Sequence, residues 1–392
     1  MPITPRITYS IGDAFSSDVL ANPHWLRPMP LGRNRESGQE SGLGPTRPVY
    51  KDYFEALRSF LTHDNFKAIR DAVREQSGHG VRAADLTAID ISLLKHGQYY
   101  HPSSVTVSGK GVTSTFVINA AISRDGRQLI DHEFHCIDRL NSTFPISFLP
   151  QVYAFGEGAW GDSDRFPMFL GEWFSGYNEF HLTGNPDTGD LKVVVWDEDE
   201  GHFDLSKAGT AELIRRAAMI LSTYYNPLTF EQIQHWHHAA GDFVVKMVDG
   251  RPDLKLITVR DYAPLIRIAA NTGDTEHDLR TMLTGCLLFF LNLSLKMRID
   301  RIDGVGEMAL YAPDVLKPVW EGFQQGLDLS CRIHQLPEGV HEQVIAYIRS
   351  CPAADLAELM TACSKRYGHD SPERKIIGAA MGDHIESITG LF

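Results

Sequence analysis

The spacing of apolar residues changes along the chain, and this change constrains the fold more than any other feature. Residues 88–123 hold three runs rich in β-branched and aromatic residues, which are separated by Gly97 and by the segment 108–111. From residue 263 to residue 392 the apolar residues recur mostly at helical spacing. Runs of the first kind favour strands, and a repeat near 3.6 residues favours helices. The sequence therefore predicts an α+β protein whose β-rich part precedes a mainly helical part.

Further elements extend the β-rich part in a definite order. A helical pattern at 129–142 follows the three runs, and two more short strands are expected at 148–156 and 168–177. Residues 179–201 then predict an additional hairpin, and residues 211–225 predict a helix. The expected order is thus three strands, a helix and two strands, ahead of a hairpin and a helical remainder.

Composition divides the chain into three predicted regions. Residues 1–85 form an N-terminal arm and helical extension, because 28–48 is rich in Gly, Pro, Ser and charge, whereas 54–78 has helical spacing. Residues 86–177 form a small β-rich region, and residues 178–392 form a large helical region. With 392 residues the chain is long enough to bury more than one hydrophobic core.

Charge and composition argue against several classes of partner. The chain has 37 basic and 50 acidic residues, a net charge of -13, and no dense Lys/Arg run. We therefore expect neither a nucleic-acid partner nor docking on a membrane, although small anions stay compatible with this balance. The N-terminus lacks the apolar stretch of a secretory signal, and the strongest apolar run, 282–295, is shorter than the roughly 20 residues that cross a bilayer. These features predict a cytoplasmic protein and leave its oligomeric state open.

The stretch IQHWHHAAGD contains the main candidates for catalytic or metal-binding residues. It holds three histidines, His235, His237 and His238, and ends at Asp242; two β-rich runs follow, and Asp261 closes the second. Two carboxylates at the ends of adjacent elements can chelate Mg²⁺, which prefers oxygen ligands. Alternatively, the two aspartates cap a turn and a helix. In an extended segment His235 and His237 would point one way and His238 the other, so only a loop could gather all three.

The order of these elements, a glutamate on the helix of the small region, and the histidine-rich loop resemble the protein-kinase-like superfamily, most of all the aminoglycoside and choline phosphotransferases. The resemblance covers about 88–298 and implies a two-lobed fold with an antiparallel-sheet small lobe, a mostly helical large lobe and, here, an N-terminal extension. It implies an ATP- and Mg²⁺-dependent phosphotransferase whose substrate is a small hydroxyl- or amino-bearing molecule.

The resemblance assigns residues of the small lobe to phosphate binding. Glu133 lies where a glutamate of the family pairs with a strand lysine that contacts the ATP phosphates. Asn119 stands at the position of that lysine, and Lys95 and Lys110 are the nearest substitutes. Gly97 lies where the family places its phosphate-covering loop, although any hairpin turn can use a glycine.

The end of the small lobe resembles the family's hinge. Glu172, Trp173 and Phe174 lie in the segment that would link the lobes, where backbone groups contact an adenine edge and an aromatic side chain flanks the base. The other interpretation is that Trp173 and Phe174 are ordinary core residues and that Glu172 is a solvated or capping group.

The histidine-rich loop resembles the family's catalytic loop. His235 matches the leading histidine, His237 the catalytic aspartate and Asp242 the asparagine, and Asp261 matches the metal-binding aspartate that follows the hairpin. The resemblance therefore implies that His237 or its neighbour His238 acts as base or substrate anchor. It also implies that Asp242 completes the catalytic loop and binds Mg²⁺ together with Asp261.

Several alternatives stay open. The absent lysine and loop aspartate also suit a catalytically silent kinase-like protein that binds a nucleotide or a partner. The same scaffold could carry out adenylyl transfer. The histidines could instead hold zinc or iron, with Asp242 or Asp261 as a further ligand. A charged turn at 298–307 either selects the substrate or is a salt-bridged surface.

Overall fold

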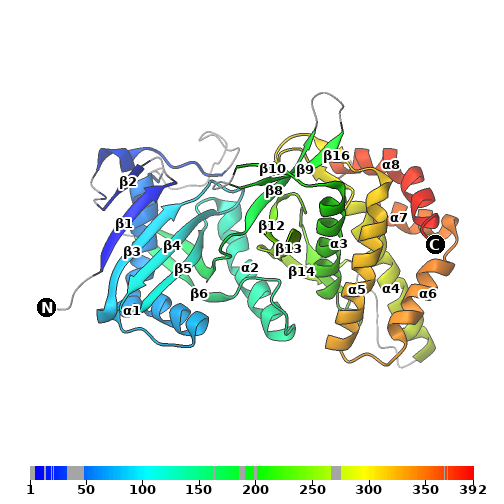
Figure 1. The fold of residues 1–392 in the computed structure, drawn as a ribbon, viewed down its shortest axis with the longest axis horizontal. Helices are drawn as coiled ribbons and strands as arrows, with labels where there is room; N and C mark the ends of the chain where they lie inside the picture. The colour runs from blue at the N-terminus through cyan, green and yellow to red at the C-terminus, as the bar shows by residue number, and fades with distance from the viewer. Residues whose placement is uncertain are drawn as a thin grey trace. The chain divides into compact units, whose positions relative to one another are not determined.

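A seven-stranded sheet organises the first part of the chain in the computed structural model (Figure 1). Its strands follow the order β2-β1-β3-β4-β5-β7-β6. They are β1 (Arg6–Ile11), β2 (Phe15–Ser17), β3 (Leu86–Leu93), β4 (His101–Gly109), β5 (Val112–Ala120), β6 (Val152–Trp160) and β7 (Asp164–Glu172). The structure describes residues 5–392 apart from 13–14, 19, 21, 33–47, 162–163, 185–189, 198–200, 266–274, 366 and 369. Most of the predicted arm at 28–48 therefore lies outside the described residues.

The central strands β3, β4 and β5 form the predicted antiparallel meander. In β3 the buried residues Ile89, Ile91 and Leu93 alternate with less buried ones, as expected for a strand with one face in the core. The N-terminal extension is not separate from this sheet, because β1 pairs in parallel with β3. Ile7 and Tyr9 of β1 pack on the same core, and this burial explains why β1 joins the sheet.

Two helices cover opposite faces of this sheet: α1 (Tyr50–Ser77) and α2 (Arg124–Thr143). Met168 and Leu170 of β7 belong to one core cluster with the buried face of α1. Phe169, which lies between them, packs with Ile130 of α2 in a second cluster. Since successive strand residues point to opposite faces, α1 and α2 lie on opposite sides of the sheet.

The chain divides into two compact units. The first comprises residues 1–139 and 150–175, and the second comprises residues 140–149 and 176–392. The regions 1–85 and 86–177, which composition separates, thus fall almost entirely into one unit, because β1 and α1 share its core.

The second unit holds a five-stranded sheet, β10-β9-β8-β12-β13, and the two-stranded sheets β11-β14 and β15-β16. The two predicted hairpins are present as β8–β9 and β12–β13. β8 also pairs with β12, a contact between distant segments that no local pattern predicts. The strands are β8 (Asn178–Gly184), β9 (Leu191–Trp196), β10 (Phe203–Asp204), β11 (Glu231–Gln234), β12 (Ala240–Val248), β13 (Arg251–Leu256), β14 (Asp261–Pro264), β15 (Ile299–Arg301) and β16 (Met308–Leu310).

Helices make up most of the rest of this unit, so the α+β content agrees with the prediction. They are α3 (Lys207–Thr223), α4 (Thr275–Lys296), α5 (Leu316–Ile333), α6 (Val340–Ser350), α7 (Ala353–Ser364) and α8 (Pro372–Thr389). By length and composition alone, the part of α4 at Glu276–Lys296 could cross a membrane, but 72% of its apolar window is buried inside the structure. Burial of this kind is expected of a core helix.

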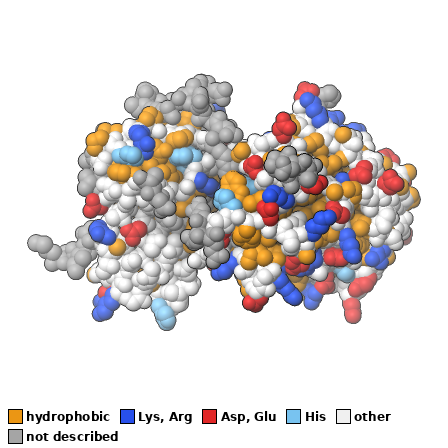
Figure 2. Space-filling view, turned by 45° about the horizontal axis from the view of Figure 1, so that its top comes forward, with side chains coloured by type: hydrophobic (Ala, Val, Ile, Leu, Met, Phe, Trp, Pro, Cys, Tyr) orange, Lys and Arg blue, Asp and Glu red, His pale blue; other side chains and the backbone are white. Residues whose placement is uncertain are grey.

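Charged side chains of both signs are interspersed on the face of the second unit that Figure 2 shows. Ion pairs of this unit include Lys192 with Asp204 and Arg332 with Asp328. Exposed pairs of this kind add little to stability. The sequence likewise contains no dense run of basic residues.

Helices α3 and α5 lie side by side (Figure 1) and approach closely enough to require glycine. A Cβ on Gly322 would lie within 3.0 Å of the carbonyl oxygen of Arg215, and a Cβ on Gly326 would lie equally close to that of Met219. Backbone oxygens inside a helix cannot rotate aside as a flexible side chain can. The packing of these two helices therefore depends on the two glycines.

We expect Gly326→Ala to lower the free energy of unfolding by about 1–3 kcal/mol, because the added methyl group overpacks the contact with α3. Urea unfolding of the full chain measures this change. Gly382→Ala in α8 is the matched control: a Cβ there meets no atom within 4 Å, so it should stabilise by up to about 1 kcal/mol through helix propensity. Equal effects of the two substitutions would contradict the close approach of α3 and α5.

Candidate functional site

A loop at 235–239 carries the three histidines between two sheets of the second unit. It leaves β11, which pairs with β14, and enters β12, which pairs with β13. His235 has a left-handed backbone, with a φ of 56°. This conformation costs a residue with a side chain about 1–2 kcal/mol, so other contacts must hold the loop in place.

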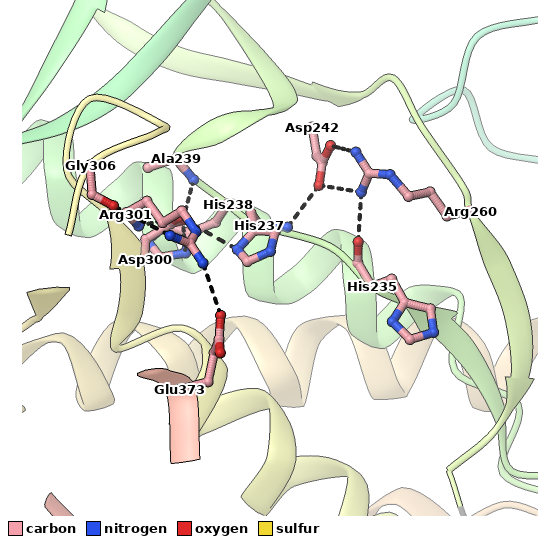
Figure 3. Close-up of polar contacts among 10 residues, drawn as sticks. All are labelled: His235, His237, His238, Ala239, Asp242, Arg260, Asp300, Arg301, Gly306 and Glu373. Carbon is pink, nitrogen blue, oxygen red and sulfur yellow. Dashed lines mark hydrogen bonds and ion pairs between the residues drawn. The ribbon is translucent and has the colours of Figure 1, made fainter. Parts of the chain in front are cut away.

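An ion pair between Asp242 and Arg260 provides these contacts (Figure 3). Nη1 of Arg260 donates to Oδ2 of Asp242 at 2.8 Å, and Nη2 donates to Oδ1. Oδ2 also accepts the N–H of His237 at 2.8 Å, while Nη1 donates to the carbonyl oxygen of His235 at 2.6 Å. The pair thus bonds the backbone at both ends of the segment that contains the candidate base.

The carboxylate of Asp242 is surrounded by donors. Besides the contacts just described, its Oδ1 accepts the hydroxyl of Thr258 at 3.2 Å, so each oxygen has two donors. Burial would raise its pKa, but the Arg260 guanidinium and then His237 lower that pKa below the ordinary value. Mg²⁺ needs open oxygen ligands in near-octahedral geometry and would have to displace the guanidinium. In this arrangement Asp242 does not fit the predicted Mg²⁺ ligand.

Asp261 lies elsewhere than the sequence predicts. β13 ends at Leu256, so Asp261 does not close the hairpin; it opens β14, where it pairs with Gln234 of β11. The reason is that β14 pairs with β11, a strand distant in sequence. The helix expected directly after Asp261, at 262–270, does not begin there, because residues 262–264 belong to strand β14; residues 266–270 lie outside the described residues. Within the described part of the chain, no three His, Cys, Asp or Glu side chains are arranged to hold a metal ion, so the histidine–metal alternative has no ligand set there.

A second buried carboxylate, Asp300, lies beside the histidines (Figure 3). It is on β15 and none of its surface is exposed. Nδ1 of His237 lies 3.6 Å from its Oδ1, and Nδ1 of His238 lies 3.0 Å from its Oδ2. The N–H of Ala239 donates to Oδ2 at 2.7 Å, and the N–H of Arg301 donates to Oδ1 at 2.7 Å. Asp300 thus lies within ion-pair distance of both imidazoles, although Nδ1 of His238 makes no hydrogen bond in this geometry, and backbone donors hold the carboxylate.

These surroundings keep Asp300 charged. Burial alone would raise its pKa, but the imidazoles of His238 and His237 and the N–H of Ala239 lower that pKa to about 2. Burial lowers the pKa of His238 below its ordinary value, against the attraction of Asp300. We therefore assign a carboxylate to Asp300 and a neutral imidazole to His238 at neutral pH, because backbone N–H donors alone can hold a buried carboxylate charged.

The two histidines differ in what they can reach. The side chain of His237 is 39% exposed, and that of His238 is 1% exposed. Nε2 of His238 is buried and has no hydrogen-bond partner among the described residues. Of these two side chains, which the sequence leaves as competitors, His237 is therefore the one that a bound molecule can meet.

His237 also lines a pocket of about 240 Å³. Segments far apart in the sequence form its walls: β11, the histidine-rich loop, α4, the β15–β16 hairpin and α8. Polar and charged side chains project into an otherwise apolar lining, a mixture typical of small-molecule sites. The lining includes Trp236, His237, Asn292, Lys296 and Glu373.

Two residues that the resemblance assigns to ATP phosphates lie on one face of the seven-stranded sheet. Glu133 is on the buried side of α2 and is 1% exposed. Asn119 pairs with Phe169 across β5 and β7, and Phe169 packs with α2. Since directly opposite strand residues point to the same face, Asn119 also lies on the α2 side. Their role in phosphate binding stays a prediction.

Lys95 and Gly97 lie in the turn between β3 and β4. β3 ends at Leu93, so Lys95 is not on the strand itself. The N–H of Gly97 donates to the carbonyl oxygen of Tyr100 at 3.0 Å, and a Cβ on Gly97 would lie 2.6 Å from that oxygen. The turn therefore requires glycine for a steric reason, and a phosphate-covering role for Gly97 stays a prediction.

Glu172, Trp173 and Phe174 lie at and just beyond the end of β7. The carboxylate of Glu172 accepts the N–H of Gln151 at 3.1 Å, and the N–H of Glu172 donates to the carbonyl oxygen of Gln151 at 2.8 Å. Glu172 thus anchors the segment that leads into β6. Trp173 and Phe174 are half-buried, and contact with a base stays a prediction for them.

The sequence does not single out Arg260 or the role of Asp300. Asp300 belongs to the charged turn at 298–307, which is not simply a salt-bridged surface: Arg298 is 1% exposed and donates to the carbonyl oxygen of Tyr311 at 3.0 Å. The available signal is that Ile299 lies between the charged residues Arg298 and Asp300, a pattern that would place both charges on one face of a strand. This pattern does not indicate which residue each charged side chain contacts.

Comparison with known proteins leaves the family of this chain undetermined. No family model and no curated protein matches the sequence. Among solved structures, WaaP in complex with acyl carrier protein is 12% identical and has a TM-score of 0.26, over 65% of this chain and 85% of that chain. This similarity is weak and carries no argument about the fold or the function of this chain.

We expect Arg260→Gln to lower the free energy of unfolding by about 3–5 kcal/mol, because it leaves the buried Asp242 carboxylate without its cation. The double variant Asp242→Asn/Arg260→Gln is the matched control, since it removes both charges and should recover much of that loss. Urea unfolding of the three proteins measures the difference. A single substitution that costs less than about 1 kcal/mol would contradict the ion pair as the contact that holds the loop.

The low pKa of Asp300 predicts an acid-dependent stability. A carboxyl whose pKa is lower in the folded than in the unfolded chain stabilises the fold above its unfolded pKa, 3.8, and loses that contribution as the pH falls through about 2. The full contribution is about 2 kcal/mol. The gap in unfolding free energy between wild type and Asp300→Asn should therefore be constant above about pH 5 and shrink below about pH 4. A gap that does not change with pH would contradict a charged, buried Asp300.

Proposed function

We propose that the chain is a kinase-like transferase that acts on a small hydroxyl- or amino-bearing molecule bound beside His237. One observation carries this proposal: the partly exposed imidazole of His237 lines the pocket, and the buried carboxylate of Asp300 lies 3.6 Å behind its Nδ1. An imidazole held in this way can accept the proton of a hydroxyl group while that oxygen forms a new bond. Transfer to an alcohol or amine requires such a proton acceptor.

In this proposal Asp300 is a positioning residue. Because Nδ1 of His237 faces Asp300, Nε2 is the nitrogen that would take the proton of the acceptor molecule. The negative charge of Asp300 would stabilise the imidazolium that results. The phosphotransferases that the chain resembles use an aspartate at the place of His237. Here a carboxylate from β15 would act through the imidazole instead.

The element order supports a kinase-like scaffold for this chemistry. Three strands, α2, two strands, a hairpin, α3, β11, the loop and the β12–β13 hairpin follow one another as in the resemblance. Asn119 and Glu133 share the α2 face of the first sheet, which agrees with a phosphate-binding role for that face. ATP is therefore the proposed donor. Since Asp242 does not fit a Mg²⁺ ligand, we assign no step to that ion.

A catalytically silent protein that binds a nucleotide or a partner is the second candidate. The Asp242–Arg260 pair favours it, because a guanidinium occupies both oxygens of the carboxylate that would hold metal in an active enzyme. The His237–Asp300 pair favours the transferase instead, because binding alone does not require a partly exposed base with a buried carboxylate behind it.

The proposal is tested by comparing enzymatic turnover by the wild-type chain with turnover by a variant that lacks the imidazole of His237. The full chain is incubated with ATP and Mg²⁺ and with choline, ethanolamine, glycolate or glycerol 3-phosphate as acceptor, and ADP, AMP and the modified acceptor are quantified. We expect ADP that depends on one class of acceptor. In His237→Asn kcat should fall by about 10²–10⁴ with a smaller change in KM, because a general base acts on the chemical step.

Three other outcomes are informative. A rate unchanged in His237→Asn, with an unchanged unfolding midpoint, would contradict the assigned base. AMP with a nucleotidylated acceptor would assign adenylyl transfer to the same site. Thermal stabilisation by ATP without any product would favour the silent candidate, because a ligand that binds only the folded chain raises its stability.

A further inference from the structure

Two buried amide side chains line the pocket without a hydrogen bond. Gln232 of β11 is 3% exposed, Asn292 of α4 is 8% exposed, and both line the pocket. Within the described part of the chain, neither side-chain amide has a hydrogen-bond partner. Gln234 on the same strand differs, because its Nε2 donates to the carbonyl oxygen of Ala263 at 2.8 Å. A buried amide without a partner is unfavourable, so two of them at one pocket indicate a ligand that supplies the missing hydrogen bonds.

The two amides are open to the pocket, unlike other buried polar groups nearby. Nε2 of His238 and the hydroxyl of Tyr311 are enclosed and lack a partner among the described residues. The amide atoms of Gln232 and Asn292 are not enclosed in this way, although both residues are more than nine-tenths buried. A molecule in the pocket can therefore reach them.

Both amides belong to elements that also position the proposed base. β11 carries Gln232 and leads directly into the loop of His237, and its pairing with β14 holds it in place. Asn292 lies one turn before Lys296 on α4, and Nζ of Lys296 lies 4.0 Å from the ring centre of Trp236, the neighbour of His237. All of these side chains line one pocket of about 240 Å³, so one small molecule can meet the amides and the imidazole together.

The charged side chains around the pocket are engaged within the chain. The carboxylate of Glu373 accepts a hydrogen bond from Nη2 of Arg301 at 3.2 Å. Lys296 contacts the ring of Trp236 and has a further interaction within the chain. Asp300 is fully buried and accepts backbone N–H groups. An ionic ligand would lose its hydration here, and it would have to displace one of these contacts to gain an opposite charge.

The chemistry of an amide group indicates the kind of ligand that it binds. Each amide offers N–H donors and a carbonyl acceptor and carries no charge. It therefore suits a neutral group that also both donates and accepts, such as a hydroxyl or a carboxamide. Ile299, Met308 and Ile377 form apolar parts of the wall, and the volume is below the roughly 300–1,000 Å³ of sites for drug-sized ligands. The lining thus suits a compact, uncharged molecule.

We propose that Gln232 and Asn292 make this pocket selective for a small uncharged alcohol. The ligand binds the amides through a second hydroxyl or a carboxamide group and presents its reacting hydroxyl to His237. This inference rests on the proposed function, because it narrows the acceptor of the same site to molecules without a net charge. It assigns a specificity-determining role to the two amides.

Ligands that differ mainly in charge test this selectivity. Glycolamide, glycolate and ethanolamine share a two-carbon body with one hydroxyl, and glycerol and glycerol 3-phosphate form a second set. Binding to the full chain is measured by ligand-observed NMR titration, which requires no turnover. We expect glycolamide or glycerol to bind at least about tenfold more tightly than its charged counterparts, because a charged ligand loses hydration without gaining a partner. Comparing glycolamide with glycerol shows whether the site prefers a carboxamide or a second hydroxyl.

Substitutions of the two amides locate the binding. Asn292→Leu and Gln232→Met keep similar volumes and remove the polar atoms, so each should weaken binding of the uncharged ligand about three- to tenfold. Their unfolding midpoints without ligand should be equal or higher, because an apolar group replaces a buried amide that has no partner. A purely structural role would lower the midpoint instead. Gln343→Met, at an exposed position of α6, is the control and should leave binding unchanged.

The outcomes separate this inference from the proposed function. Uncharged ligands that bind through the two amides support the inference even if no ADP or AMP forms with them, in which case the transferase proposal alone fails. Tighter binding of glycolate, ethanolamine or glycerol 3-phosphate than of the uncharged ligands overturns the inference and leaves the role of His237 intact. Binding of neither uncharged ligand, or equal affinity in Asn292→Leu and Gln232→Met, overturns it as well. If either variant has a lowered midpoint, the alanine variant at that position replaces it.

Discussion

The buried ion pair between Asp242 and Arg260 is the interaction on which the candidate site depends. It bonds the backbone at His235 and at His237, and so holds a loop whose first residue has a left-handed backbone. Breaking it would leave a charge buried without a partner, a cost that ordinary surface contacts cannot offset. The same pair occupies the carboxylate that the resemblance assigns to Mg²⁺. One interaction therefore both positions the proposed base and removes a ligand from the expected metal site.

Two buried carboxylates near the loop have different partners. Asp242 contacts a guanidinium and backbone, whereas Asp300 contacts the imidazoles and backbone N–H groups from two segments. Asp300 can thus support proton transfer through His237 while its own charge stays out of the pocket. In the proposed function, this arrangement separates the negative charge of Asp300 from the imidazole that meets the substrate. The proposed proton transfer follows from the presence of an imidazole where the resembled family has a carboxylate.

Local pattern was enough to predict many of the elements. Runs of β-branched and aromatic residues predicted the three strands β3, β4 and β5, and helical spacing predicted α2 and α3. Two β-rich runs after the histidines, together with the resemblance, predicted the β12–β13 hairpin. Pairings between distant strands were not predicted: β1 with β3, β8 with β12, and β11 with β14. Because β11 pairs with β14, Asp261 lies at the start of β14 and not at the end of a hairpin, where the sequence predicted it. Pairing between distant strands depends on which apolar faces meet. The residues of one strand do not specify which distant strand it will pair with.

The sequence by itself determined the order of the elements, the mixed α+β content and the presence of three histidines and several carboxylates in one region. Only the tertiary structure decided that Asp242 meets Arg260 and that Asp300, 61 positions from Ala239, lies behind His237. The physical reason is that a buried charge must find donors or an opposite charge. Which group supplies them depends on the strands and loops that packing brings together. Tertiary packing also decided that His238 is enclosed and that His237 lines the pocket, and this difference distinguishes the proposed base from a neighbour that the sequence could not separate from it.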